Sequence, residues 1–150
     1  MIRPADPGDA EIVRTLVQHA YAPWIPRLGR VPGPMKDDYA LRIAAAQLWV
    51  LEQDGKIVGL VVLEEQPESL LLENIAVLPS EQGQGYGRML MAFAEQEAAR
   101  RGFPQLQLCT NARLTENIAL YEHLGFTEIG RICGEGFERV CLAKSVQVEV

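Results

Sequence analysis

Residues 75–89 read Ile75-Ala76-Val77-Leu78-Pro79-Ser80-Glu81-Gln82-Gly83-Gln84-Gly85-Tyr86-Gly87-Arg88-Met89. The stretch leads from an apolar strand through a glycine-rich turn into a helix. Without Cβ atoms at the three glycines, backbone amides can approach a phosphate oxygen directly and adopt positive φ angles. This order of elements favours a phosphate-binding loop, although a tight turn without a ligand would use the same glycines.

The helix that follows begins in an unusual way. A helix start favours Asp or Glu in its first turn, yet the first residues here are Gly85, Tyr86, Gly87 and Arg88. The unpaired N–H groups and the helix dipole therefore suit an anion supplied from outside the chain. The rest of the helix is ordinary, with an apolar stripe, two terminal cations and a closing glycine. These residues are Met89, Leu90, Phe93, Ala94, Ala98, Arg100, Arg101 and Gly102.

Two other kinds of phosphate loop are excluded. The stretch has no Gly-Lys-Ser/Thr, and its glycines do not follow the spacing G-x-G-x-x-G. It resembles instead the acyl-CoA loop of the GCN5-related N-acetyltransferases, the GNAT family. The signature of that loop, Gln/Arg-x-x-Gly-x-Gly/Ala, is matched by Gln82, Gly85 and Gly87.

A second stretch strengthens the resemblance. Residues 117–126 read Asn117-Ile118-Ala119-Leu120-Tyr121-Glu122-His123-Leu124-Gly125-Phe126. They look like the family's late helix, with its Tyr-x-x-x-Gly-Phe ending intact. The order also fits, because the family places an Ile-Ala-Val strand just before the loop and the tyrosine helix one strand later. The resemblance is clear from Glu73 to Phe126.

The resemblance implies both a fold and a function. The fold is α/β (α+β), with a mixed, mostly antiparallel central sheet that is flanked by helices and split between strands 4 and 5, where the acyl carrier lies. A single N-acetyltransferase domain would cover residues 1–150. The implied function is an acetyl-CoA-dependent N-acetyltransferase that moves an acetyl group to a primary amine by direct transfer in a ternary complex.

The resemblance also implies which residues contact acetyl-CoA. Backbone amides of Ile75, Ala76 and Val77 would contact the pantetheine and the thioester carbonyl. Asn117 is a candidate for binding the pantetheine arm, with Asn111 as a competitor. The loop residues expected to bind the phosphates are Gln82, Gly83, Gln84, Gly85, Tyr86, Gly87 and Arg88.

Acyl transfer to an amine requires a base. Removing a proton from a lysine-like amine near neutral pH costs on the order of 4 kcal/mol. Glu73, at the head of the strand beside the expected split, is the candidate base, acting directly or through a water. A salt-bridged strand-edge carboxylate is the alternative. The resemblance assigns the general acid to Tyr121, which would protonate the leaving thiolate, and plain packing on the sheet is the alternative.

Residues 21–35 contain four of the chain's nine prolines. Such density excludes long regular structure. The resemblance implies that this region walls the acceptor pocket, with Trp24, Arg27 and Arg30 facing the acceptor and an arginine binding an acceptor carboxylate. A loop packed by Trp24 and Ile25, with both arginines solvated, is the alternative.

Composition narrows the class of protein. The 150 residues are 48% hydrophobic, which is enough for a single core. With a net charge of −6 and a pI near 5.0, we expect no nucleic-acid partner and no membrane partner. No apolar run approaches the ~18 residues of a membrane span, and the first residues do not form a secretory signal. We therefore expect a cytoplasmic protein.

The cysteines and histidines indicate no metal site. Cys109, Cys133 and Cys141 contain no C-x-x-C pair, and His19 and His123 are not paired for metal binding. We expect reduced cysteines that serve in packing, and no bound metal.

Hydrophobic periodicity predicts mixed secondary structure. Asp54-Gly55 predicts a two-residue hairpin turn, and the long apolar run at 70–78 predicts a strand buried on both faces. Strands are expected at 2–5, 48–53, 56–65, 70–78, 106–110, 126–133 and 137–143. Helices are expected after Asp6-Pro7, at 37–46, after the glycine loop and at 115–124.

Two functions of other classes stay open. A non-catalytic acyl-CoA-binding or sensing domain would bind CoA without releasing thiol for any amine. A nucleotide-binding α/β domain of another family would be stabilised by ATP or NAD rather than by acetyl-CoA. The sequence does not name the acceptor amine or distinguish a peptide from a small molecule, and it leaves a homodimer open.

Overall fold

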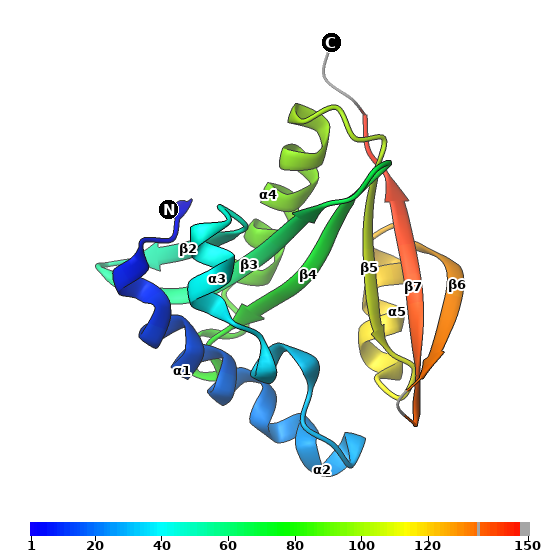
Figure 1. Cartoon of the computed structure of the whole chain (residues 1–150), viewed down its shortest axis with the longest axis horizontal. Coiled ribbons are helices and arrows are strands. Elements are labelled where there is room, and N and C mark those ends of the chain that lie inside the picture. The colour runs from blue at the N-terminus through cyan, green and yellow to red at the C-terminus, as the bar shows by residue number, and fades with distance from the viewer. Residues whose placement is uncertain (135, 148–150) are drawn as a thin grey trace. The chain divides into compact units, whose positions relative to one another are not determined.

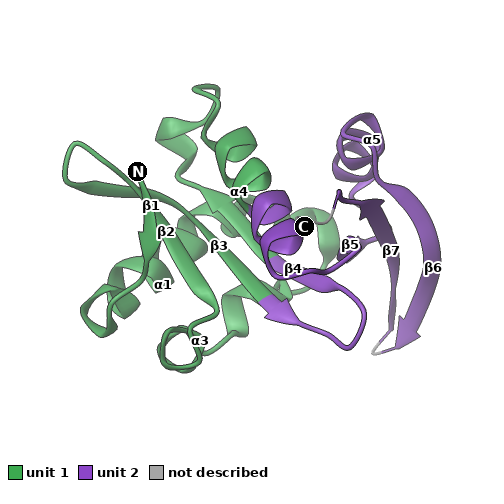
Figure 2. Ribbon diagram, turned by 90° about the horizontal axis from the view of Figure 1, so that it is seen from above, with its two compact units in different colours: residues 1–63, 74–93 green, residues 64–73, 94–150 purple. Residues whose placement is uncertain are grey.

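The computed structural model describes residues 1–134 and 136–147 (Figure 1). They belong to two compact units, which Figure 2 colours separately. Unit 1 comprises residues 1–63 and 74–93, and unit 2 comprises residues 64–73 and the chain from 94 onward. Strand β4 (Leu70–Val77) and helix α4 (Tyr86–Arg100) each contribute to both units.

Unit 1 is built on strands in the order β1-β2-β3-β4. β1 (Ile2–Pro4) pairs antiparallel with β2 (Leu48–Gln53), and β2 pairs antiparallel with β3 (Lys56–Glu65). Asp54 and Gly55 both have positive φ, so the predicted two-residue hairpin turn is confirmed. The helices before β2 are α1 (Ala10–Tyr21), α2 (Ile25–Leu28) and α3 (Tyr39–Ala44), and single 3-10 turns occupy Pro7–Asp9, Ala22–Trp24, Gly33–Lys36 and Pro79–Glu81.

The main core of unit 1 lies between the sheet and helices α1 and α3. Figure 2 shows these two helices on one face of the strands and α4 on the other. α1 contributes Val13, Leu16 and Val17, whose spacing places them on one side of the helix. The other members of this core are Tyr39, Ile43, Leu48, Val50, Ile57, Leu60, Val62 and Ala76.

α4 approaches β3 closely at Gly59. A Cβ atom there would lie 3.0 Å from the Leu90 side chain and 3.1 Å from the Ala76 carbonyl oxygen, so a larger residue would require these neighbours to shift. The predicted apolar stripe of α4 needs one correction. Met89 is 45% exposed, whereas Met91 is 5% exposed. The buried face of the helix is centred on Leu90, Ala94 and Ala98, and Met89 lies outside it.

Unit 2 has the strand order β4-β5-β7-β6. β4 pairs parallel with β5 (Gln105–Asn111) through Leu70–Leu106 and Leu71–Gln107, and within the described chain the pairing of these two strands ends there. β7 (Phe137–Ser145) pairs antiparallel with both β5 and β6 (Thr127–Gly134), and α5 (Thr115–His123) connects β5 to β6. The predicted fold class, a mixed and mostly antiparallel sheet with flanking helices, is confirmed.

The expectation that β4 is buried on both faces is wrong. Exposure alternates along the strand, with Leu70, Leu72, Asn74 and Ala76 buried and Glu73 exposed. The remaining positions, 71, 75 and 77, are half-buried. The apolar run therefore marks one fully buried face and one partly covered face.

The cysteine expectation is also wrong. Cys109 on β5 and Cys141 on β7 stand opposite each other in the strand register and form a disulfide. They are 32 residues apart in the sequence, and no spacing motif marks them, so only the strand pairing brings them together. Cys133 is free but exposed, so it is not a packing residue either.

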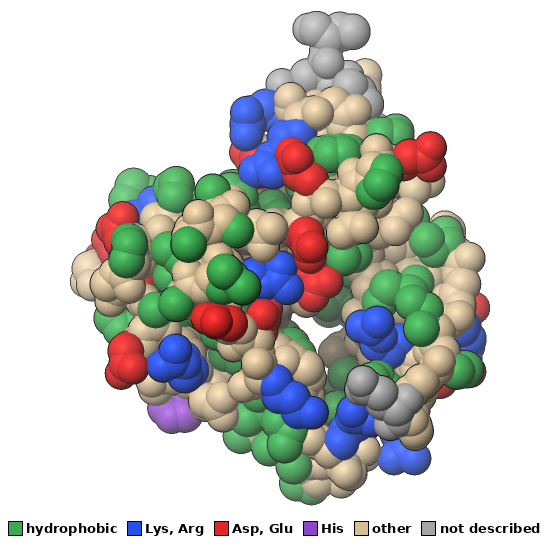
Figure 3. Space-filling model, in the orientation of Figure 1, with side chains coloured by type: hydrophobic (Ala, Val, Ile, Leu, Met, Phe, Trp, Pro, Cys, Tyr) green, Lys and Arg blue, Asp and Glu red, His purple; other side chains and the backbone are tan. Residues whose placement is uncertain are grey.

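The surface carries charges of both signs. On the face drawn in Figure 3, acidic, basic and hydrophobic side chains are all exposed. Within the described residues, no helix has the length and apolar character needed to cross a membrane.

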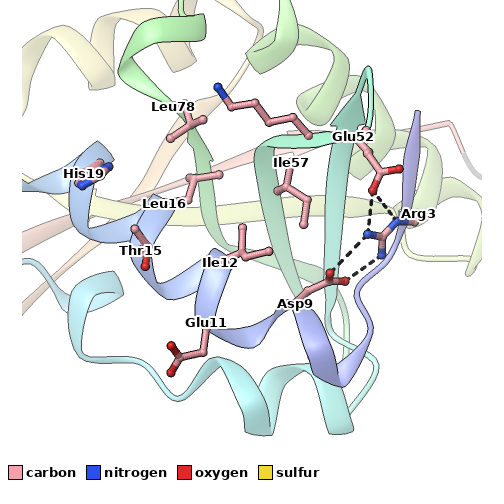
Figure 4. A pocket seen from close by; sticks show the side chains of 12 residues that line it. Arg3, Asp9, Glu11, Ile12, Thr15, Leu16, His19, Glu52, Ile57 and Leu78 are labelled. Atoms are coloured by element: carbon pink, nitrogen blue, oxygen red, sulfur yellow. Dashed lines mark hydrogen bonds and ion pairs between the residues drawn. The ribbon is translucent and has the colours of Figure 1, made fainter.

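Arg3 connects three segments of unit 1. Its guanidinium lies 2.8 Å from Asp9 Oδ2 and 2.9 Å from Glu52 Oε2, so it joins β1, the turn before α1, and β2 (Figure 4). The hydrogen bond from Arg3 lowers the pKa of Asp9 below its ordinary value.

We expect Asp9→Asn to lower the Tm at neutral pH by roughly 3–6 °C, through a loss of about 1–2 kcal/mol. The pKa of Asp9 is lower in the folded state than in the unfolded state. The ionised carboxylate therefore stabilises the fold fully at a pH above the unfolded-state pKa, and this stabilisation is lost as the pH falls through the folded-state pKa. Thermal melts of both proteins from neutral to acidic pH check this. A Tm difference that stays constant on acidification would contradict it.

Candidate functional site

The glycine loop lies in unit 1 between β4 and α4. Gly83 and Gly85 have φ angles of +86° and +85°, the left-handed conformation that favours glycine. Gly87 is already helical. A Cβ atom built on any of the three would meet no described atom within 4 Å. Packing therefore does not require these glycines, and the space beside the loop is open to a ligand.

The start of α4 keeps the features of an anion site. The helix begins at Tyr86 and has no acidic residue in its first turn, while Arg88 is exposed there. The loop's own carboxylate, Glu81, accepts a hydrogen bond from Gln84 at 3.0 Å and lies 3.9 Å from Lys56 Nζ. The residue before the helix, Gly85, has no side chain that could cap it, and the first turn contains no carboxylate. The N–H groups of this turn therefore suit an external anion.

One edge of β4 is turned away from β3. Leu78 N donates to Val58 O of β3 at 2.9 Å. Because successive residues of a strand direct their N–H and C=O groups to opposite edges, Ala76 also turns its polar groups toward β3, whereas Ile75 and Val77 turn theirs to the other edge.

Side chains of unit 1 satisfy the carbonyl groups on that edge. The Tyr21 hydroxyl donates to Ile75 O at 3.2 Å, and the Gln82 side-chain amide donates to Val77 O at 3.4 Å. The N–H groups of Ile75 and Val77 project from the same edge. This is the geometry that backbone donors need if they are to contact an extended ligand.

The proline-rich segment, residues 22–36, folds as short helical turns that are anchored by buried Leu28. The Arg27 guanidinium stacks over the Trp24 ring, 5.6 Å from its centroid. Arg30 is half-buried. Arg27 itself is exposed, so the assignment of Trp24, Arg27 and Arg30 to the acceptor wall stays a prediction.

Tyr121 belongs to unit 2, near the end of α5. Its ring meets Phe126 edge-on, with the ring centroids 5.9 Å apart, and Phe126 is 2% exposed. Between them Gly125 has a φ of +102°, which lets the chain leave the helix. Burial raises the pKa of Tyr121, so its hydroxyl keeps its proton at neutral pH.

The other predicted residues of unit 2 have distinct settings. Asn117 is half-buried on α5, one turn before Tyr121. Its competitor Asn111 uses Oδ1 to accept a hydrogen bond from Arg113 N at 2.9 Å, and thereby shapes the turn that leads into α5. Glu73 is exposed on β4.

The predicted residues thus fall into two groups. Unit 1 holds the loop, the β4 edge and the proline-rich segment. Unit 2 holds the predicted acid and base, Tyr121 and Glu73, together with Asn117. Within unit 1, Tyr21 links two of the predicted regions, because it ends α1 just before the proline-rich segment and bonds to Ile75 on β4.

Sequence reasoning missed a polar network in unit 1. The hydroxyl of Tyr21 donates to Asn74 Oδ1, and Asn74 Nδ2 donates to the hydroxyl of Tyr39 at 3.0 Å. Asn74 is 5% exposed. The one signal in the sequence was a polar amide inside an otherwise apolar strand.

A pocket of about 580 Å³ lies elsewhere in unit 1, between α1 and the β2–β3 hairpin (Figure 4). Its apolar wall includes Ile12, Leu16 and Ile57, and one end holds Arg3, whose charge is already met by two carboxylates. The predicted site residues do not line it. The pocket gives no separate argument for a ligand.

Comparison with known proteins agrees with this geometry. A model of the acetyltransferase (GNAT) domain matches residues 44–128. The chain is 36% identical over 90 residues to an uncharacterized N-acetyltransferase, YjgM, of Escherichia coli K12, covering 57% of this chain and 54% of that protein. It is 40% identical over 78 residues to the ribosomal protein bS18-alanine N-acetyltransferase of the same organism, covering 52% and 53% respectively.

Solved structures give the same result over a greater length. The crystal structure of the ribosomal-protein-S18-alanine N-acetyltransferase from Escherichia coli matches with a TM-score of 0.76 and 25% identity, covering 100% of this chain and 96% of that one. In sequence, the chain spans about half the length of the curated relatives it matches. Since the family model covers more than half of the chain and includes both the glycine loop and the tyrosine helix, the chain belongs to the GNAT acetyltransferase family.

Proposed function

We propose that the protein is an acetyl-CoA-dependent N-acetyltransferase that moves an acetyl group to a primary amine by direct transfer in a ternary complex. The observation that carries the proposal is the glycine loop, whose open space and bare helix start fit an anionic donor. Family membership supports the same activity. In this proposal residues 1–150 act as one catalytic domain.

The residues of unit 1 suit the parts of acetyl-CoA. The amides of the loop from Gln82 to Arg88 would hold the phosphates, and the N–H groups on the outer edge of β4 would hold the pantetheine. Asn117 on α5 would add a side-chain contact to the pantetheine arm. Acetyl-CoA supplies the acetyl group and a thiolate leaving group when it is bound.

The base and the acid are assigned to unit 2. Glu73 would take the proton of the acceptor ammonium, directly or through a water, which offsets a cost on the order of 4 kcal/mol near neutral pH. Tyr121 would give its proton to the departing sulfur. Burial raises the pKa of Tyr121, so the hydroxyl is protonated where the reaction runs.

Tyr121→Phe should lower kcat roughly 10²-fold while the Kd for acetyl-CoA changes little, because proton donation strengthens only in the transition state. An acyl donor with a more acidic thiol should suffer less from the substitution. In the wild type, the raised pKa predicts no loss of rate from Tyr121 ionisation below pH ~10. Steady-state kinetics with both donors check this, and an equal slowing of both would make Tyr121 a positioning residue.

The acceptor is proposed from this chain alone. Trp24, Arg27 and Arg30 lie outside the residues that the family model matches, so the acceptors of relatives do not transfer. A cation stacked on an aromatic ring suits an acceptor that carries a carboxylate beside its amine. Both a peptide terminus and a small amino compound meet this description.

An acceptor panel tests the proposal. Purified protein with acetyl-CoA is offered peptides with a free N-terminal alanine, lysine peptides, amino acids and polyamines, and free thiol is measured. Thiol release that depends on one of these amines supports the proposal. If acetyl-CoA raises the Tm but no amine releases thiol, the acyl-CoA-sensing alternative holds. If ATP or NAD raises the Tm and acetyl-CoA does not, the donor assignment is wrong.

The setting of the enzyme is part of the same proposal. We propose a cytoplasmic enzyme that acts on small-molecule or peptide amines, with neither nucleic acid nor membrane as partner, in keeping with its net charge of −6. A homodimer is compatible with this proposal, and sedimentation of the purified protein would measure it.

A further inference from the structure

Asn74 is a buried polar residue in the interior of unit 1. Its side chain is 5% exposed and lies on the same face of β4 as Ala76, a member of the core beneath α1 and α3. Burying an amide is unfavourable unless protein groups replace its hydrogen bonds to water. The partners of Asn74 therefore matter to its role.

Its hydrogen bonds fix the orientation of the amide. The Tyr39 hydroxyl has one proton, which it donates to Pro34 O. Tyr39 must therefore accept from Asn74 Nδ2, at 3.0 Å, and Asn74 Oδ1 accepts from the Tyr21 hydroxyl. Asn74 acts as donor and acceptor at once, which neither Asp nor Leu can reproduce.

The two tyrosines lie at the two ends of the proline-rich segment. Tyr21 ends α1 and Tyr39 begins α3, and the residues proposed to face the acceptor lie between them. Near its second end, the segment is also held by the Gln18 side-chain amide, which donates to Met35 O at 3.2 Å. One asparagine thus connects both ends of the segment to the same point on β4.

That point adjoins the edge proposed to contact the donor. Ile75 follows Asn74 directly, and its carbonyl oxygen lies 3.2 Å from the same Tyr21 hydroxyl, whose single proton is shared between this oxygen and Asn74 Oδ1. The network therefore links the segment that would bind the acceptor to the part of β4 that would bind the acyl group.

We infer that Asn74 is a positioning residue that holds both ends of the proline-rich segment against β4 and thereby sets affinity for the acceptor. The inference rests on the proposed function, because it takes this segment to be the acceptor wall. A network that only stabilised the fold would change the Tm and leave the segment and the acceptor kinetics unmoved.

Trp24 reports on the segment without any substrate. The chain has two tryptophans, and Trp49→Phe keeps an aromatic ring against Phe93, so this background leaves Trp24 as the single tryptophan, which is excited at wavelengths where tyrosine does not absorb. In it, Asn74→Ala should raise the acrylamide quenching constant of Trp24 about two-fold, because the segment opens more often. Val50→Ala, a truncation in the same core, is the stability control and should leave quenching unchanged.

Kinetics with an acceptor from the panel supply the second measurement. Asn74→Ala and Tyr21→Phe should raise the acceptor KM about 10-fold while the acetyl-CoA-induced rise in Tm persists. Val50→Ala should leave the acceptor KM unchanged. Unchanged Trp24 quenching in Asn74→Ala would overturn the inference, as would altered quenching with an unchanged acceptor KM. A wild-type protein that acetyl-CoA fails to stabilise would instead refute the proposed function, and the quenching result would stand.

Discussion

Replacing Gly85 by valine should abolish the rise in Tm that acetyl-CoA gives the wild-type protein. Gly85 has a φ of +85°, and the space where a side chain would project holds no described atom within 4 Å. Valine would be strained in that conformation by about 1–3 kcal/mol and would fill the space proposed for a phosphate. Thermal melts with and without acetyl-CoA measure the effect.

Substitutions at two other glycines show whether lost binding comes from backbone strain or from a side chain in the ligand's space. Gly55 has a φ of +77° and is equally open, so Gly55→Val carries similar strain away from the loop and should keep the stabilisation by acetyl-CoA. Gly87 is open but has an ordinary helical φ, and the loop signature admits only Gly or Ala there, so Gly87→Leu adds a bulky side chain without backbone strain and should weaken binding. Stabilisation that survives in both Gly85→Val and Gly87→Leu would refute the phosphate site.

Replacing Glu73 by glutamine should lower turnover on the order of 10²-fold or more near neutral pH. Glutamine keeps the shape of the side chain but cannot take a proton. The rate should partly recover at high pH, where free amine is abundant. The pH dependence of kcat/KM for both proteins is the measurement.

A neighbouring carboxylate provides the control. Glu68 is exposed in the loop before β4, so Glu68→Gln removes a similar charge and should leave the profile unchanged. If Glu73→Gln gives the same pH–rate profile as the wild type, another group or bulk water takes the proton.

Most of the fold follows from local pattern. Each predicted strand agrees with the structure to within two residues at both ends, because Asp54-Gly55 and the glycine loop mark the turns and apolar runs mark the strands. The corrections all depend on contacts distant in sequence. The Cys109–Cys141 bond needs the pairing of β5 with β7, and the half-covered face of β4 needs the packing around it.

The candidate site likewise contains features that local sequence predicts and contacts that it does not. The loop was predictable because its glycines and its missing helix cap are local features. The network of Tyr21, Tyr39 and Asn74 was not, because an isolated asparagine in an apolar strand does not name its partners. The stack of Arg27 on Trp24 also escaped prediction, since it depends on the turns that the segment adopts.

The capped edge of β4 has a consequence for solubility. Unpaired strand edges are templates on which other chains add strands, and proteins protect them to avoid aggregation. Tyr21 and Gln82 occupy the carbonyl oxygens of Ile75 and Val77, the acceptors that an incoming strand would need. The N–H groups beside them stay available to a small ligand. A strand edge whose carbonyl oxygens are covered and whose N–H groups are exposed can bind a small ligand that accepts hydrogen bonds. The same edge resists pairing with a strand of a second polypeptide.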